Sequence, residues 1–531
     1  MTIPYDRRPS TLQRPNSTTR SGRARRWAVP ACVATVAMWM GQVVGAVLER
    51  SLSRLVHRES ASRHPVGRAR AGTRRSSKRV TWARVSVVLG LSIGAVVVVP
   101  AAHLATADSS GTVVDPVVAW NANAGEAAVA ACIAPADNPL HESRMYAMMH
   151  IAVHDAVNAI DRRSRPYAFR GAAVPGASVD AAVAAAAHDV LVPLLLAIPA
   201  PFPPACGQAG AASVEADYAA ALAAIPDGAA KTHGLAVGHD AAAAILSLRA
   251  GDGSDTPLIV EESPQGTQPG EYRFTPGTPF QFAPGWADVT PFVLRTSSQF
   301  RAAKPYKVTS KKYATDYEEV KRLGGDGVNT PSARTTDETE IALFWVESSP
   351  LQWNRIARTV SNDAGLDTWE NARLFGLLNL SLADGYISSF ETKNHYNFWR
   401  PVTAIREGDH DGNRRTDGDA TWTPLVTTPP ISDHDSAHAV QGGAAAQVLM
   451  RFFGTDHIGF ETCSLTLPAG QTCAGPSPVR RSYTSFTQAA DENGESRILV
   501  GFHFRRAVDE GIEHGRRIAD RAVNRFLRPV H

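Results

Sequence analysis

A lysine and an arginine in the segment KNHYNFWRP can direct two positive charges at one anion. Lys393 and Arg400 are seven residues apart, which on an α-helix places them within about 20° of one face. Pro401 disfavours helical backbone at Arg400, so we expect the arginine at a helix end, near a loop. Two cations that converge in this way can bind a tetrahedral oxyanion.

A serine and a histidine precede an alanine-rich run. Ser436 is a natural N-cap for a helix predicted over 436–453, where free backbone N–H groups and the positive end of the helix dipole favour an anion. His438, in the first turn, would stand beside that anion as a general acid or base. A Ser-Ala-His sequence at a helix start is, by itself, more often a simple cap.

The segment SRILVGFH carries a third pair. Arg497 offers bidentate donors to an oxyanion, and His503 follows six residues later. Six residues are about 240° around an ideal helix, so the two side chains can meet only if the chain bends near Gly501 or if the anion lies deep between elements. Phe502 and Phe504 flank His503, and a buried core histidine is the alternative interpretation.

The elements that must position these residues are predicted to be helices. Apolar residues recur with the helical period over 143–160, 180–197, 214–224, 231–250, 310–323, 335–346, 367–389, 436–453 and 496–526. Gly/Pro-rich and Asp/Gly-rich stretches at about 251–290 and 407–420 are predicted loops. We therefore predict an all-α fold of helical bundles with long connecting loops.

The chain divides by charge near its N-terminus. Residues 1–84 hold 18 Arg/Lys against 3 acids, a net of about +15, and since the whole chain is at +3 the remainder carries about −12. An acidic globular part argues against a nucleic-acid partner. Residues 1–107 are interpreted as a basic region with apolar signal or anchor segments, and residues 108–531 as the globular domain.

Two apolar runs support export. Residues 27–48 are about long enough to span a bilayer, and residues 85–100 precede Ala105-Thr106-Ala107, a small-x-small cleavage sequence. We expect an exported protein, either cleaved near Ala107 or held by a membrane anchor. After residue 107 the four cysteines are Cys132, Cys206, Cys463 and Cys473. Pairing Cys463 with Cys473, and hence Cys132 with Cys206, suits an oxidising compartment, and four free thiols are the alternative.

The three charged segments occur together in a diagnostic order. Lys-x6-Arg-Pro, Ser-x-His and Ser-Arg-x5-His resemble the signature of the vanadium-dependent haloperoxidase and type 2 phosphatidic-acid phosphatase (PAP2) superfamily, in its bacterial vanadium chloroperoxidase-like branch. The resemblance covers roughly 115–525 and is strongest over 370–520. It implies two four-helix-bundle-like units, with the active site in the half at about 335–528.

The resemblance also implies a role for each residue. Lys393, Arg400 and Arg497 would bind the equatorial oxygens of vanadate, with further contacts from the Ser436 side chain and the Ala437 N–H group. His503 would be the axial vanadium ligand, His438 the acid/base, and Lys393 the catalytic cation that polarises the peroxide. Hydrogen peroxide and a halide, chloride or bromide, are the implied substrates of this peroxidase, with hypohalous acid as product and an unidentified organic acceptor.

Two positions depart from the family pattern. Ala437 replaces the usual glycine, and Ala507 stands where the family often has an aspartate that orients the axial histidine. Losing such an aspartate should weaken His503 as a ligand. Two alternatives therefore stay open: an acid phosphatase of the same superfamily with His503 as nucleophile, which needs no vanadate, and a catalytically silent oxyanion-binding envelope protein. His150 and His154, four residues apart, could form a metal pair but are expected to pack between helices.

Overall fold

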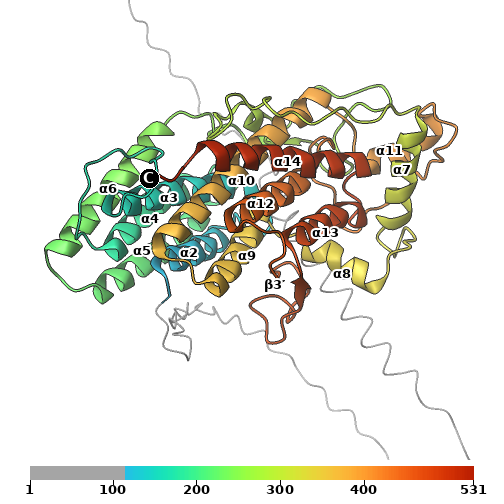
Figure 1. Ribbon diagram of the computed structural model, residues 1–531. Helices are drawn as coiled ribbons and strands as arrows, with labels where there is room; N and C mark the ends of the chain where they lie inside the picture. Colours follow the sequence, from blue (N-terminus) through green and yellow to red (C-terminus); the bar gives the residue numbers. More distant parts are fainter. Residues whose placement is uncertain (1–113, 531) are drawn as a thin grey trace, which may run out of the picture.

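The structure, a computed structural model, describes residues 114–530, and α-helices supply nearly all regular structure in that range (Figure 1). The predicted all-α fold is confirmed. The first helices are α2 (Pro116–Ala130), α3 (Pro139–Ile160), α4 (Val179–Leu196), α5 (Pro204–Ala224), α6 (Ala229–Leu248), α7 (Lys311–Leu323) and α8 (Thr336–Phe344). The others are α9 (Ser349–Ala364), α10 (Thr368–Tyr396), α11 (Pro401–Arg406), α12 (Ala437–Phe453), α13 (Phe486–Leu499) and α14 (Arg505–Arg525).

Short elements occur in the predicted loops and in the segment between α12 and α13. Strand β1 (Ile259–Val260) pairs antiparallel with β2 (Gln281–Phe282), and β3 (Phe460–Cys463) pairs with β4 (Arg480–Tyr483). Two 3-10 helices, η1 (Pro284–Asp288) and η2 (Gly408–His410), complete the regular structure of the described range.

The helices form two groups that are joined by α10. In the first group α4 packs against α3, α5 and α6, and in the second α12 packs against α10, α13 and α14 (Figure 1). Helix α10 also packs against α3, so it joins the two groups. A capping box between Asp367 and Glu370 fixes its start, and Asn397, at φ 43°, ends it. The C-terminal end of this shared helix carries Lys393.

Helix boundaries differ from prediction where proline or glycine intervenes. The single helix predicted over 496–526 is wrong: α13 ends at Leu499 and α14 begins at Arg505, because Gly501 adopts φ +86°. Helices α2 and α9 were not predicted. Each has a proline in its first turn, where the missing N–H costs nothing.

Both expected disulfides are present. Cys132 pairs with Cys206 and Cys463 with Cys473, at Cα–Cα distances of 5.6 and 5.3 Å. Within residues 114–530, α4 is the one helix whose length and composition could cross a membrane, and 56% of its apolar window is buried inside the protein, as in a core helix. The predicted signal or anchor segments of residues 1–107 lie outside the described residues.

Candidate oxyanion site

Lys393 anchors the segment that leads into α12. Its buried Nζ donates to the carbonyl oxygens of Ser432 and Asp433, each at 2.9 Å, and to that of Asp435. All three N–H groups of the ammonium are therefore used by backbone carbonyls. Lys393 holds residues 432–435 against the end of α10 and brings the start of α12 to the same place.

Arg400 reaches the same place through a turn. Because α10 ends at Tyr396, the prediction that Lys393 and Arg400 share one helical face is wrong, whereas the helix-end position of Arg400, the N-cap of α11, is confirmed. Arg400 Nε donates to the Ile431 carbonyl at 2.6 Å, and Nη1 lies 2.9 Å from His503 Nε2. Arg400 is 2% exposed, and its guanidinium connects the segment before α12 with the segment that carries His503.

The start of α12 contributes His438. Ser436 is the N-cap as predicted, and its Oγ accepts from the Ala439 N–H at 3.5 Å. His438 is half-buried and hydrogen-bonds the backbone of Glu347, while its Nε2 atom is buried and has no partner. A buried ring nitrogen without a partner is costly and invites a ligand.

Arg497 and His503 meet across the break between α13 and α14. Arg497 lies in the last turn of α13, where Nη2 donates to the Trp345 carbonyl at 2.6 Å and Nε to Ser496 Oγ at 2.9 Å. His503 follows in the turn, so the predicted bend near Gly501 is confirmed. The bend lets two side chains from opposite faces of an ideal helix approach one site.

Two glycines in contact set the path of this turn. A Cβ on Gly501 would lie 2.7 Å from the carbonyl oxygen of Gly324, at the end of α7. A Cβ on Gly324 would lie 2.6 Å from the Cα of Gly501. Neither position has room for a side chain, so the backbone carrying His503 is seated directly on the end of α7.

Asp433 orients His503, and sequence reasoning missed it. Asp433 Oδ1 lies 2.9 Å from His503 Nδ1, across 70 residues of sequence. We assign the Nδ1-protonated tautomer, which donates to Asp433 and leaves the Nε2 lone pair facing Arg400. Ala507 is buried and carries no charge, so the carboxylate expected on α14 comes instead from the segment before α12. The expectation that His503 lacks an orienting carboxylate is therefore wrong.

A second buried carboxylate fixes that segment from behind. Asp435 accepts from Ser389 Oγ at 2.7 Å and lies 2.7 Å from His514 Nδ1, while His514 Nε2 contacts Ser388 Oγ at 2.8 Å. All four side chains are fully buried. They link α10, α14 and residues 432–436 and so keep the site segments in register.

Three other candidates hold loops or helices in place. Asp384 lies nine residues before Lys393, a position from which it could pair with a site cation, but its carboxylate accepts the N–H groups of residues 292, 293 and 294 at 2.6–2.8 Å instead. His150 contacts Asn121, and His154 bridges Asp155 and Ser164. Within residues 114–530 no group of three His, Cys, Asp or Glu side chains could hold a metal ion.

The charges at the site are unbalanced. Burial, reinforced by neighbouring positive charge, lowers the pKa of Arg497 to about 9 and that of Lys393 to about 7. Burial also lowers the pKa of Arg400 to about 10, against the pull of Asp433. Burial and the nearby cations hold the pKa values of His438 and His503 well below the usual range, so both rings are neutral at pH 7. An anion would offset the crowding of cations.

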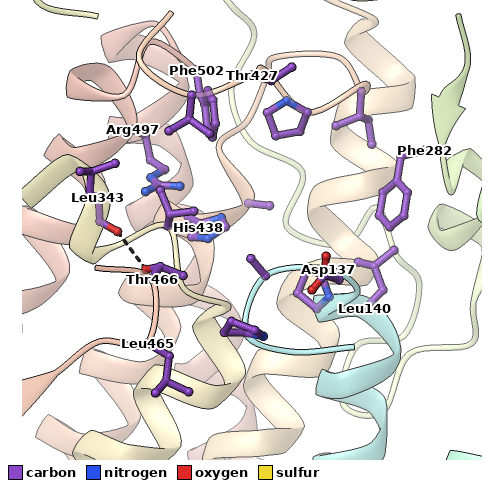
Figure 2. A pocket seen from close by; sticks show the side chains of 18 of the residues that line it. Asp137, Leu140, Phe282, Leu343, Thr427, His438, Leu465, Thr466, Arg497 and Phe502 are labelled. Carbon is purple, nitrogen blue, oxygen red and sulfur yellow. Dashed lines mark hydrogen bonds between the residues drawn. The ribbon is translucent and has the colours of Figure 1, made fainter. Parts of the chain in front are cut away.

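These groups line one cavity of about 710 Å³, and their part of the lining is called the charged floor below. Its lining includes Lys393, Arg400, Ala437, His438, Arg497 and His503. In Figure 2, His438 and Arg497 lie side by side, with Phe282 and Leu140 across the cavity. Ser436 does not line the cavity, because its hydroxyl caps the helix. The structure thus brings together all six predicted side chains and opens five of them to a common space.

The chain resembles known proteins over this half. Residues 373–531 match the family described as the VCPO second helical-bundle domain. Over 289 residues, 43% of the chain, it is 25% identical to vanadium chloroperoxidase from Curvularia inaequalis. The resemblance to the vanadium-dependent haloperoxidase superfamily is confirmed. The match spans 47% of that relative, about half its length.

Solved haloperoxidase structures share the fold. A bacterial vanadium-dependent iodoperoxidase superposes with a TM-score of 0.61 at 23% identity, covering 78% of this chain and 96% of that one. A holo-type bacterial vanadium-dependent chloroperoxidase superposes with a TM-score of 0.59 at 17% identity, covering 76% and 94%. The haloperoxidase-like architecture therefore extends through both helical groups, beyond the matched family region.

Proposed function

We propose that the protein is a vanadate-dependent haloperoxidase that oxidises chloride or bromide with hydrogen peroxide to hypohalous acid. The observation that carries this proposal is the set of three buried cations and two neutral histidines on the floor of one cavity. The superfamily resemblance supports the same chemistry. An oxyanion is the ligand that offsets this excess of positive charge.

The donor set fits vanadate. Arg400 and Arg497 would hold its oxygens, and Lys393 would join them by exchanging a carbonyl contact. His503 Nε2, which faces away from Asp433 and lies 2.9 Å from Arg400 Nη1, would ligate the vanadium by exchanging that contact. The first-turn N–H groups of α12, including that of Ala437, would add contacts. The Ser436 hydroxyl is the member of the set that the geometry supports least, since it caps the helix. When bound, vanadate supplies Lewis acidity and needs no change of oxidation state.

The protein's own groups would manage protons and orientation. The overall reaction consumes hydrogen peroxide, one halide ion and one proton, and releases hypohalous acid and water. His438, neutral and with Nε2 unpartnered, is placed to carry that proton at Nε2. Lys393 could polarise the peroxide, as the family resemblance implies, only by giving up one of its three carbonyl contacts.

We also propose that the protein works outside the cytoplasm. The two disulfides support this placement, because such bonds persist in oxidising compartments. Subcellular fractionation with an antibody to the globular part tests it. Recovery only from the cytoplasm, with all four cysteines reduced, would contradict the proposal.

The test of function uses the full-length protein. It is incubated with orthovanadate in phosphate-free buffer, and hypohalous acid formation from bromide or chloride is followed after adding peroxide. Bromide oxidation is expected in the wild type and in the exposed control His410→Ala, with a loss of about 100-fold or more in His438→Ala and His503→Ala. Phosphate-ester hydrolysis without vanadate, in place of halide oxidation, would assign the phosphatase alternative. Vanadate binding with neither activity would assign the silent binding protein.

A further inference from the structure

Each disulfide braces a segment of the cavity wall. Cys463–Cys473 closes a loop that places Leu465 and Leu467 on the cavity. Cys132–Cys206 ties together two loops, at 135–137 and 201–202, on another part of the lining. Loops are ordinarily the most mobile parts of a fold, so covalent closure beside a cavity keeps the cavity open and of constant shape.

The loop closed by Cys463–Cys473, residues 464–472, is also anchored by hydrogen bonds. Thr466 Oγ1 donates to the Leu343 carbonyl at 2.9 Å (Figure 2), and Arg355 Nη1 donates to the Cys463 carbonyl at 2.8 Å. The backbone N–H of Cys473 donates to the Ser464 carbonyl at 3.0 Å. The wall is thus held at both ends and at its centre.

Above the charged floor, the cavity is mainly apolar. The 464–472 loop faces aromatic and aliphatic side chains from elements of both helical groups and the 251–290 segment. These side chains are Leu140, Phe280, Phe282, Leu343, Phe390 and Ile431. Asp137 contributes the one carboxyl group in the lining, and burial raises its pKa to about 6. This apolar part of the lining favours contact with an uncharged, apolar group, whereas ions are expected at the cations.

The volume sets the size of the occupant. A halide ion and hydrogen peroxide would leave most of 710 Å³ unfilled. Pockets of about 300–1,000 Å³ with apolar walls and a few polar groups at one end hold drug-sized organic molecules. The charged floor supplies the polar end, and the apolar walls supply the surface that a hydrocarbon would bury.

We propose that the cavity binds a neutral, largely hydrocarbon organic acceptor with an electron-rich double bond or aromatic ring, and that the 464–472 loop determines which acceptor fits. This inference rests on the proposed function. Hypohalous acid formed at the floor transfers its halogen to a carbon of the bound molecule. The carbon–halogen bond forms, the carbon loses a proton, and that proton leaves with the hydroxide of the hypohalous acid as water. Hydrogen peroxide is the only oxidant consumed.

Binding is tested without turnover. The neutral fluorophore N-phenyl-1-naphthylamine is titrated into the full-length protein loaded with vanadate. Leu467→Asp, which puts a charge on the wall, is expected to raise the probe Kd at least about tenfold. The matched control Leu248→Asp lies on an exposed helix end outside the cavity and should leave the Kd unchanged. Vanadate binding, measured by equilibrium dialysis, should be the same in all three proteins.

A second variant covers a failure of Leu467→Asp to fold. Cys463→Ser with Cys473→Ser releases the loop and is expected to weaken probe binding several-fold while vanadate binding persists. Probe binding that is equal in the wild type and both wall variants would overturn the inference. Probe binding that depends on the wall in a protein without halide oxidation would overturn the proposed function and leave the apolar site standing.

Turnover gives the second readout. The ratio of brominated isomers of 1-naphthol made by the wild type with peroxide and bromide is compared with that made by added hypobromous acid. We expect the wild-type isomer ratio to differ from the ratio made by added hypobromous acid. In Leu467→Asp the isomer ratio should shift toward that of added hypobromous acid. Identical ratios throughout would place the halogenation in solution and overturn the role of the wall.

Discussion

Replacing Asp433 tests whether a carboxylate borrowed from another segment can orient the proposed vanadium ligand. Its Oδ1 contacts His503 Nδ1 at 2.9 Å, and no hydrogen-bond partner is found for Oδ2. In Asp433→Ala the ring loses the acceptor that fixes its tautomer. In Asp433→Asn an oxygen can still accept from Nδ1, but the charge is gone. The two variants should therefore form a graded series.

The size of the effect follows from this one contact. Burial raises the pKa of Asp433 to about 7, so the carboxyl group is mainly ionised in dialysis above that pH. A hydrogen bond to a charged group then contributes about 1.5–3 kcal/mol, which corresponds to about 10–150-fold in affinity. Losing the orienting partner of a metal-ligating histidine generally costs about 10–100-fold. The two ranges agree, so Asp433→Ala should weaken vanadate binding about 10–100-fold, with Asp433→Asn in between.

The assay is equilibrium dialysis of the full-length protein against orthovanadate, with metal analysis of both compartments. Asp384→Asn is the matched control, because it also removes a buried carboxylate but one that anchors residues 292–294 and does not line the cavity. Circular dichroism and thermal unfolding would show that each variant is folded. A folded Asp433→Ala protein that binds vanadate within twofold of the wild type would refute the reasoning.

Three further predictions concern stability and the site turn. Glu142 is buried beside Ser348, and burial raises its pKa from 4.5 to about 8. Because the folded-state pKa lies above the unfolded one, the protonated side chain contributes its full stability to the fold below pH 4.5. This contribution is lost as the pH rises to 8. Glu142→Gln should therefore gain stability relative to the wild type between pH 5 and pH 8, by up to a few kcal/mol at about 1.4 kcal/mol per pKa unit, and equal melting differences at both pH values would contradict this. Cys132→Ser with Cys206→Ser removes a disulfide whose sequence separation is 74 and should lower the free energy of unfolding, measured with denaturant, by about 4 kcal/mol. An unchanged unfolding midpoint would contradict this prediction. Gly501→Ala should lower the free energy of unfolding by about 1–3 kcal/mol and weaken vanadate binding in dialysis, because φ +86° and the atoms around an added Cβ both exclude a side chain. Vanadate binding equal to that of the wild type would show that the turn tolerates the change.

The charged residues of the site were predictable because they recur in three short sequence segments. Their types, order and spacing indicate the superfamily and the proposed anion site even where each segment alone is ambiguous. The reasoning from ideal helices was less successful. It placed Lys393 and Arg400 on one face, but Asn397 ends α10 between them. Left-handed backbone at a non-glycine residue has only a weak sequence signal.

Asp433 was not predictable from spacing. Its contact with His503 joins residues 70 positions apart, and only the packing of the segment before α12 against the α13–α14 turn brings them together. A signal was nevertheless present in the sequence Ser432-Asp-His-Asp435, which puts two carboxyl groups just before the N-cap serine. Two acids in a segment that lies against buried cations are rarely accidental, since each must have a partner. The sequence lacks a carboxylate at Ala507, and Asp433 supplies one from the segment before α12.

The contact between Gly324 and Gly501 has an evolutionary consequence. Each glycine is confined by the other's backbone, so a mutation at either position encounters the same obstacle. Gly324, at the end of α7, lies 179 positions before His503 in the sequence and carries no chemical group, yet a methyl group there would displace the turn that presents the histidine. In a set of orthologous sequences the two sites should therefore change together or not at all. A lineage that has lost glycine at one of them should also have remodelled the turn.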